Sequence, residues 1–246
     1  MTDGDRTPPA RCRVMGIVNV TPDSFSDGGR YFSPEEAVRR ARNLVDEGAD
    51  IVDLGGESTR PGATPLAWNE EWDRLAPVME RVASCACVSV DTYHPETAER
   101  AVAAGAKIVN CVFPESVPAM LEIVAAHPGV ELVLPAVARE VCPSALLPRC
   151  YLDPMIGFGT TREEDLALLN SVAELARHGR VLVGASRKRI VKRLTGEKVT
   201  GKDLAGNLTV AVWAALHGAS VVRVHDVRET VQALRVLAAL REGERT

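Results

Sequence analysis

The chain is predicted to fold as a single α/β domain of the (β/α)8 barrel class, and three observations lead to this prediction. Its 246 residues lie near the roughly 250 typical of such barrels. Short apolar runs rich in β-branched residues recur along the chain, as is typical of parallel strands buried on both faces. Amphipathic stretches of helical length separate most of these runs. Over this length, the alternation favours a closed barrel over an open sheet.

The apolar runs and the amphipathic stretches give the expected order of elements. Strands are expected at 14–20, 51–55, 87–91, 107–112, 131–137, 150–153, 181–185 and 220–225. Helices are expected at 34–47, 70–84, 95–104, 117–126, 162–178, 202–217 and 228–241. The first helix has a clear start, because Pro34 follows Ser33 and two acidic residues come next. The connection after the fifth strand has only about a dozen residues, near the minimum for a parallel crossover, so its helix is expected to be shortened or missing.

Composition and charge narrow the possible functions. Aromatic residues make up only 4% of the chain and the formal net charge is −4, which argues against a nucleic-acid partner. No apolar run approaches the roughly 20 residues that span a bilayer, so no membrane partner is expected. The six cysteines show no C-x-x-C pair and no zinc-type spacing, which favours a reduced, cytoplasmic protein. Residues 1–13 are polar and contain proline, and we expect a flexible tail there before a barrel domain over 14–246.

Polar side chains gather at the predicted carboxyl ends of the strands, where barrels of this class place their active sites. Long polar loops follow the first two strands, one after Asn19 within the run 15–29 and one over 55–62, and loops of such length are often functional. The polar groups at the strand ends are Asn19, Asp53, Asp91, Asn110, Asp153, Ser186-Arg187-Lys188, Arg223 and His225. Their convergence on one mouth predicts the active site.

One cluster consists of acids and an amide: Asp91, Asn110 and Asp153, with Lys188 nearby. A buried carboxylate is costly unless it is paired or hydrogen-bonded. Two carboxylates and an amide in one pocket would suit a flat heterocycle with several N–H donors, such as a pterin or a purine. For any one of these residues, a helix cap or an internal salt bridge is an equally good interpretation.

A second cluster is cationic and consists of Arg60, Arg223 and His225, with Asn19 alongside. Arginine matches phosphate oxygens with two parallel hydrogen bonds, and the last strands of such barrels commonly bind phosphate. Asn19 and a phosphate together could share a Mg2+, which prefers hard oxygen ligands. Other chemistries have less support. The glycine pairs form neither a dinucleotide fingerprint nor a P-loop, and Ser186 has no histidine adjacent in sequence that would suggest a nucleophilic triad.

Seven segments make the chain resemble the dihydropteroate synthase family, pterin-dependent transferases of folate biosynthesis. They are Met15–Gly29, Gly55–Gly62, Ser89–Thr92, Gly105–Asn110, Asp153–Gly159, Gly184–Lys188 and Arg223–Asp226. These segments span nearly the whole chain, and the first two are highly specific together.

The resemblance implies a TIM barrel that joins a 7,8-dihydropterin pyrophosphate to p-aminobenzoate and releases pyrophosphate, with Mg2+ as cofactor and a homodimer as the assembly. By motif, it implies catalytic roles for Asp91, Lys188, Arg223 and His225. Three groups of binding residues follow in the same way: Asp91, Asn110, Asp153 and Lys188 for the pterin; Asn19, Arg60, Arg223 and His225 for the pyrophosphate, with Asn19 on the metal; and Thr59, Pro61, Phe158, Lys188 and Arg189 for p-aminobenzoate.

The chain departs from the family's usual residues at five positions. Cys111 stands in place of an acid, Pro135 in place of a histidine, Met155 in place of glycine, Thr160 in place of lysine and Arg189 in place of serine. These positions surround the pterin floor and the second substrate. They leave open an alternative, a diverged paralogue that binds pterin with weak or no synthase activity or with another acceptor. A further alternative is a pterin-dependent methyltransferase, which shares the barrel. Methyl transfer requires no pyrophosphate-binding site, however, and the 15–29 segment suggests one.

Overall fold

Eight parallel strands close into a barrel in the computed structural model, which describes residues 11–21, 33–57, 64–199 and 201–243. Each strand pairs with its neighbour in sequence, and β8 pairs with β1 through Val14 and Val222. The strands are β1 (Arg13–Asn19), β2 (Ile51–Gly55), β3 (Val88–Asp91), β4 (Ile108–Asn110), β5 (Glu131–Pro135), β6 (Cys150–Asp153), β7 (Arg180–Val183) and β8 (Val221–Val224). The predicted barrel is confirmed. The predicted tail lies mostly outside the described residues.

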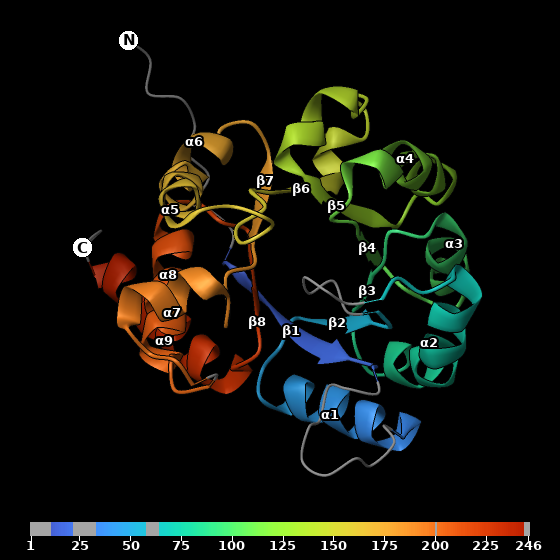
Figure 1. Cartoon of the computed structure of the whole chain (residues 1–246), viewed down its shortest axis with the longest axis horizontal. Coiled ribbons are helices and arrows are strands. Elements are labelled where there is room, and N and C mark those ends of the chain that lie inside the picture. The colour runs from blue at the N-terminus through green and yellow to red at the C-terminus, as the bar shows by residue number, and fades with distance from the viewer. Residues whose placement is uncertain (1–10, 22–32, 58–63, 200, 244–246) are drawn as a thin grey trace.

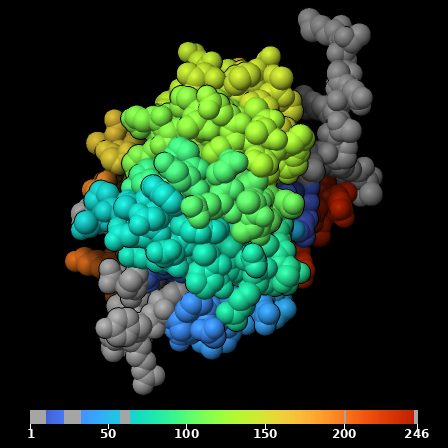
Figure 2. Space-filling model, turned by 90° about the vertical axis from the view of Figure 1, so that its right-hand side faces the viewer, coloured from blue at the N-terminus to red at the C-terminus, as the bar shows by residue number. Residues whose placement is uncertain are grey.

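Helices form a ring around the strands (Figure 1). They are α1 (Pro34–Asp46), α2 (Trp68–Ala83), α3 (Pro95–Ala103), α4 (Val117–Ala126), α5 (Arg162–Asn170), α6 (Val172–Leu175), α7 (Arg189–Thr195), α8 (Leu204–Leu216) and α9 (Val227–Gly243). Figure 2 shows the flank of the barrel that α2, α3 and α4 cover. Ser33 caps α1 by accepting a hydrogen bond from the Glu36 amide, as its sequence predicts. Among the helices of the described ranges, none is both long and apolar enough to cross a membrane.

The connection between β5 and β6 contains two short 3-10 helices, η2 (Ala136–Val141) and η3 (Leu147–Arg149), instead of an α-helix. This confirms the predicted gap in the helical ring. Before the connection, η1 (Pro114–Ser116) leads into α4. The guanidinium of Arg149 ties the connection to α4, because Nη2 donates to the carbonyl oxygens of Val124 at 2.7 Å and His127 at 2.5 Å. These carbonyls lie at the end of α4, where no further helical turn supplies a donor.

The helix after β7 was not predicted. Residues 189–195 form α7, which ends at Gly196 with φ of +74°, a conformation that glycine adopts without strain. Sequence reasoning recognised only the longer amphipathic stretch that became α8. The predicted helix over 162–178 is divided at Ser171 into α5 and α6.

The inside of the barrel has an apolar floor and a polar layer above it. Met15, Ile51, Ile108, Val133, Tyr151, Leu182 and Val221 form the floor. Side chains alternate along a strand, so the residue two positions later lies on the same face. Those positions are occupied by Asp53 after Ile51, by Asn110 after Ile108, and by corresponding polar residues on β6 and β8. The strands therefore carry a polar layer toward the mouth of the barrel.

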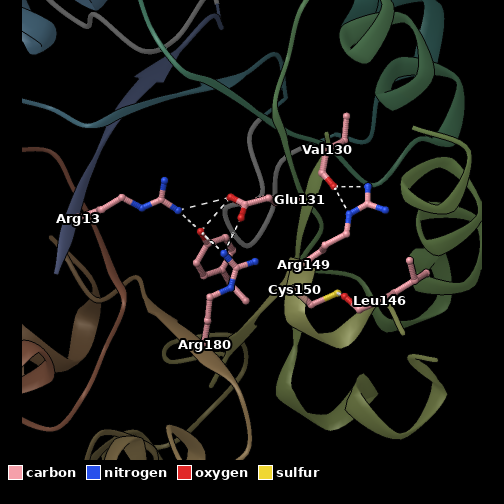
Figure 3. A network of polar contacts seen from close by, with 8 residues as sticks. Arg13, Val130, Glu131, Leu146, Arg149, Cys150 and Arg180 are labelled. Atoms are coloured by element: carbon pink, nitrogen blue, oxygen red, sulfur yellow. Dashed lines mark hydrogen bonds and ion pairs between the residues drawn. The ribbon is translucent and has the colours of Figure 1, made fainter. Parts of the chain in front are cut away.

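Below the floor, Arg13, Glu131 and Arg180 at the amino-terminal strand ends meet the hydroxyl of Tyr151 in a basal network (Figure 3). The Tyr151 hydroxyl donates to Glu131 at 2.9 Å and accepts hydrogen bonds from both arginines. Arg180 also lies over the tyrosine ring, 4.0 Å from its centroid, and pairs with Glu131 at 2.5 Å. This network closes the end of the barrel opposite the predicted site.

Candidate active site

A buried ion-pair network joins three strands in the polar layer. The Arg223 guanidinium donates from Nε to Asp53 at 2.6 Å and from Nη2 to Asp91 at 2.5 Å. The same oxygen of Asp53 accepts a hydrogen bond from Asn110 Nδ2 at 3.2 Å. The Asp53 side chain is fully buried, whereas that of Arg223 is 19% exposed. Asp53 thus holds Arg223 on one side and Asn110 on the other.

Burial and pairing act in opposite directions on this network. Burial raises the pKa of Asp91, and Arg223 opposes that shift while Asp53 adds to it. Burial lowers the pKa of Arg223, but Asp53 and Asp91 outweigh it, so the net shift of that pKa is upward. The arginine therefore remains charged, and two carboxylates share it.

Asp153 and Lys188 approach the mouth from β6 and from the segment after β7. Asp153 is 5% exposed and accepts a hydrogen bond from the Met155 amide at 2.7 Å. Lys188 Nζ donates to the carbonyl of Ile156 at 2.6 Å. A Cβ on Gly157 would come 2.9 Å from Lys188 Cδ, and Gly157 also has φ of +79°. A glycine at this position therefore lets the lysine chain cross the loop after β6.

Electrostatics couple this lysine to its acidic neighbour. Burial lowers the pKa of Lys188 to about 8, although Asp153 raises it. Burial raises the pKa of Asp153, with Lys188 as the main opposing charge. Lys188 Nζ also lies 4.2 Å from the centroid of the Phe158 ring, within the range of a cation–π contact. Lys188 is thus coupled electrostatically to Asp153 and lies against an aromatic ring.

Asn19 ends β1 on the same rim. A Cβ on Gly55 would come 3.9 Å from Asn19 Oδ1 and 3.9 Å from Asp91 Oδ2, so glycine keeps open a space that the two oxygens border. Within the described ranges, no group of three or more metal-binding side chains occurs. The amide oxygen of Asn19 and the carboxylate of Asp91 are hard oxygen donors of the kind that Mg2+ prefers.

His225 follows β8 and contacts a residue that sequence reasoning did not connect with it. Its Nδ1 lies 3.2 Å from Ser186 Oγ, and the same oxygen accepts the His225 backbone N–H at 3.3 Å. On the other side, Arg40 Nη2 donates to the His225 carbonyl at 3.1 Å. His225 is therefore held from the segment after β7 and from α1.

The predicted p-aminobenzoate residues are only partly within the described ranges. Phe158 and Lys188 touch, as described above. Arg189 begins α7, is exposed, and donates from Nη2 to the Thr160 carbonyl at 3.0 Å. Thr59 and Pro61, and the pyrophosphate candidate Arg60, lie outside the described residues.

The other four departures have identifiable surroundings. Met155 adopts φ of +67°, a left-handed conformation that explains why glycine is usual there. Thr160 Oγ1 donates to Asp165 at 2.5 Å and accepts from the Gly157 amide at 3.1 Å, so it braces the loop after β6. Cys111 is fully buried after β4, and Pro135 ends β5 opposite Asp153. These replacements pack into the rim.

Two residues at the site were given no binding role by sequence reasoning. Asp53 was placed at its strand end, but its contact with Arg223 spans 170 positions in sequence. The signal that marks it is the spacing: it follows Ile51 by two residues, as Asn110 follows Ile108. Ser186 carries no comparable signal, because it lies beyond the end of β7, where the two-residue period of a strand no longer applies.

The family described as pterin binding enzymes matches this chain over residues 15–145 and 144–225. The dihydropteroate synthase of Escherichia coli strain K12 is 38% identical over 257 residues, which cover 92% of this chain and 90% of that protein. The dihydropteroate synthase of Mycobacterium leprae is 39% identical over 272 residues, with 94% of each chain covered.

Solved structures of dihydropteroate synthases are also similar to this chain. The Xanthomonas albilineans dihydropteroate synthase with 4-aminobenzoic acid superposes with a TM-score of 0.86 at 40% identity, covering 94% of this chain and 93% of that one. The same enzyme in complex with 7,8-dihydropteroate superposes with a TM-score of 0.81 at 35% identity, covering 95% of each chain.

Proposed function

The chain belongs to the dihydropteroate synthases within the pterin-binding enzymes, and from this premise we propose which residues carry out its reaction. The reaction is a transfer: 7,8-dihydropterin pyrophosphate condenses with p-aminobenzoate to give dihydropteroate and pyrophosphate. The observation that supports the proposed site most strongly is the pairing of Arg223 with Asp53 and Asp91 beneath the mouth. It places a fixed cation beside the acid and amide groups that suit a pterin.

The pterin is proposed to bind among Asp91, Asn110, Asp153 and Lys188. Carboxylate and amide oxygens accept hydrogen bonds from ring N–H groups, and a lysine donates to a ring carbonyl or nitrogen. Burial of the two carboxylates favours this use, because a ligand N–H offsets part of their desolvation. Asn110 Oδ1 is buried without a partner among the described residues, so it has capacity to accept one such hydrogen bond.

The pyrophosphate is proposed to lie toward Arg223, His225 and Asn19, and the motif assigns Arg60 to it as well. Arg223 is paired in advance, so its guanidinium needs little rearrangement to face an anion. Asn19 would be the protein ligand of a Mg2+ shared with the phosphates. When bound, that ion would neutralise part of the charge on the leaving pyrophosphate.

The second substrate is proposed to enter beside Thr59, Pro61, Phe158, Lys188 and Arg189. The exposed guanidinium of Arg189 suits the carboxylate of p-aminobenzoate. Phe158 supplies an aromatic face for the substrate ring. No protein nucleophile is required, because positioning and stabilisation of the departing pyrophosphate let the arylamine attack the methylene carbon.

The decisive experiment measures pyrophosphate release. Purified protein with Mg2+, dihydropterin pyrophosphate and p-aminobenzoate is expected to release pyrophosphate and form dihydropteroate. Binding of the pterin substrate in calorimetry without any release would instead support the diverged paralogue.

Variants of Arg223 test whether its guanidinium stabilises the departing pyrophosphate. Arg223→Lys keeps the charge but loses the paired hydrogen bonds, and is expected to lower kcat by about 10²-fold, as removal of one oriented donor does elsewhere. The exposed Arg42 of α1 gives a matched control, Arg42→Lys, which should leave kcat unchanged. Unaltered kcat in Arg223→Lys would contradict the assignment.

A homodimer and a cytoplasmic location are also proposed. Trp213 and Leu216 on α8, and Val236 and Leu240 on α9, are large apolar side chains left exposed. Burial of such side chains commonly accompanies association of subunits. All six cysteines are free thiols, as suits a reducing compartment. Sedimentation of the purified protein tests the dimer.

A further inference from the structure

Two successive residues after β7 hold two successive residues after β8. Ser186 Oγ contacts both the backbone amide and the ring Nδ1 of His225, at 3.3 and 3.2 Å. The next residue, Arg187, pairs with Asp226 at 2.6 Å. The segment that carries Lys188 and the segment that carries His225 are therefore tied together residue by residue.

The backbone that carries Ser186 is itself fixed. Arg187 adopts φ of +59°, a left-handed conformation that non-glycine residues keep only where their surroundings enforce it. Its amide donates to Asn207 Oδ1 of α8 at 2.9 Å, and its guanidinium holds Asp226. Ser186 thus belongs to a rigid turn, which makes its hydroxyl a fixed point for the neighbouring strand.

The contacts of His225 restrict both its backbone and its ring. Ser186 accepts the backbone N–H, and Arg40 donates to the backbone carbonyl. The contact of the hydroxyl with Nδ1 then limits rotation of the ring and turns Nε2 away from Ser186. A hydroxyl suits both protonation states of the ring, because it donates to a neutral Nδ1 and accepts from a protonated one.

The same geometry does not suit Ser186 as a nucleophile. An activated serine gives its proton to a histidine whose other nitrogen is oriented by a third group, usually a carboxylate. Asp226, the acid next to His225, is held by Arg187 instead. The hydroxyl oxygen also accepts the His225 amide hydrogen, which occupies one of its lone pairs.

We propose that Ser186 is a positioning residue, whose hydroxyl fixes the imidazole of His225 in the orientation that contacts the pyrophosphate of the substrate. The pyrophosphate contact rests on the function proposed above. Ser186 itself acts only through His225 and has no role on the reacting atoms.

A double-mutant cycle with inorganic pyrophosphate as the probe tests the coupling. Calorimetry with Mg2+ compares the unaltered protein with Ser186→Ala, His225→Ala and the double variant. Ser186→Ala is expected to weaken binding about 2- to 10-fold, the range for one neutral hydrogen bond. In the His225→Ala background the same change should have a clearly smaller effect, because the contact with the ring is gone and only the hydrogen bond to the backbone amide of position 225 remains. Effects that multiply in the double variant would overturn the proposal.

Two control variants separate the hydroxyl from the fold. Ser186→Thr keeps the hydroxyl and should bind pyrophosphate within about 2-fold of the unaltered protein, the small remainder expected when the hydrogen bond is retained. Ser84→Ala removes another side-chain hydroxyl at the end of α2, which donates to the Arg81 carbonyl, and should leave binding unchanged.

Nitrogen NMR of the His225 imidazole separates this proposal from the proposed function. Loss of the hydroxyl in Ser186→Ala should shift the Nδ1 resonance whether or not pyrophosphate binds. If the unaltered protein fails to bind pyrophosphate while Nδ1 shifts, the positioning contact stands and the proposed function fails. An unchanged Nδ1 resonance would overturn the contact itself.

Discussion

Replacement of Asp53 by asparagine tests whether the buried carboxylate organises the site. The substitution keeps the shape of the side chain and removes its charge. Asp53 is fully buried and accepts from Arg223 Nε at 2.6 Å and Asn110 Nδ2 at 3.2 Å through one oxygen. An asparagine oxygen can still accept, but it carries no charge and brings an amide group with two hydrogens into the same space.

The magnitude follows from what remains after the change. Removing one partner of a buried ion pair usually costs about 3–5 kcal/mol, because the other charge is left alone. Here Arg223 keeps Asp91 at 2.5 Å, and the repulsion between the two carboxylates is relieved. The expected loss in the free energy of unfolding is therefore that of one charged hydrogen bond, about 1.5–3 kcal/mol. For a chain of this length, that loss lowers Tm by about 3–12 °C.

Chemical and thermal unfolding measure the loss, and an exposed pair supplies the comparison. Glu174 pairs with Arg177 at 2.9 Å with both side chains more than half exposed, so Glu174→Gln should cost less than about 0.5 kcal/mol. The pKa of Asp91 should also fall in Asp53→Asn, because the Asp53 charge raises it. A loss of stability no larger than that of Glu174→Gln, together with an unchanged Asp91 pKa in carboxyl NMR, would refute this reasoning.

Three further changes probe the lysine, the basal network and the loop after β2. Since burial lowers the Lys188 pKa to about 8, its positive charge is present below that pH, and the affinity for the pterin substrate should fall as pH rises through 8 in calorimetry. Tyr151→Phe keeps the ring but removes the hydroxyl shared within the basal network, and should lower the free energy of unfolding by about 1–3 kcal/mol in urea. Gly56→Ala would place a Cβ 2.9 Å from Glu71 Cγ and 3.0 Å from its carbonyl oxygen, and should cost about 1–3 kcal/mol in the same assay.

Each of these changes has its own control. Lys188→Arg keeps the charge at high pH, so an inflection near pH 8 that persists in this variant would rule out Lys188 as its source. Tyr151→Phe should leave pyrophosphate affinity unchanged, and a large loss of affinity would contradict the separation of basal network and mouth. Gly129→Ala places a Cβ with no atom within 4 Å, so equal losses in Gly56→Ala and Gly129→Ala would contradict the crowding argument.

The fold was predictable because its signals are local and repeated. Each strand is a short apolar run, and a hydrophobic period can be read from neighbouring residues alone. The capping of α1 by Ser33 was also local and was confirmed. The division of the 162–178 helix and the short helix α7 were not predicted, because turns of one or two residues depend on packing against neighbouring helices rather than on the period of the sequence.

The candidate site was predictable to the level of which residues reach the mouth. Strand ends of a parallel barrel meet at one rim, so placing Asp91, Asn110 and Asp153 there needed only the strand boundaries. The contacts that these polar residues make with one another could not be predicted in the same way. Ser186 and His225 are 39 positions apart, and Asp53 and Arg223 are 170 apart. No local pattern states which of the polar groups on the rim will touch.

The sequence by itself determined the barrel, the rim residues and the family chemistry, because the period of the strands and the order of the motifs can be recognised without knowing any contact. Only the tertiary structure decided that Arg223 is shared by Asp53 and Asp91, that Lys188 crosses Gly157 with a lowered pKa, and that Ser186 holds His225. The reason is physical: charge pairing and desolvation depend on distances across the barrel, and closure of the strands sets those distances.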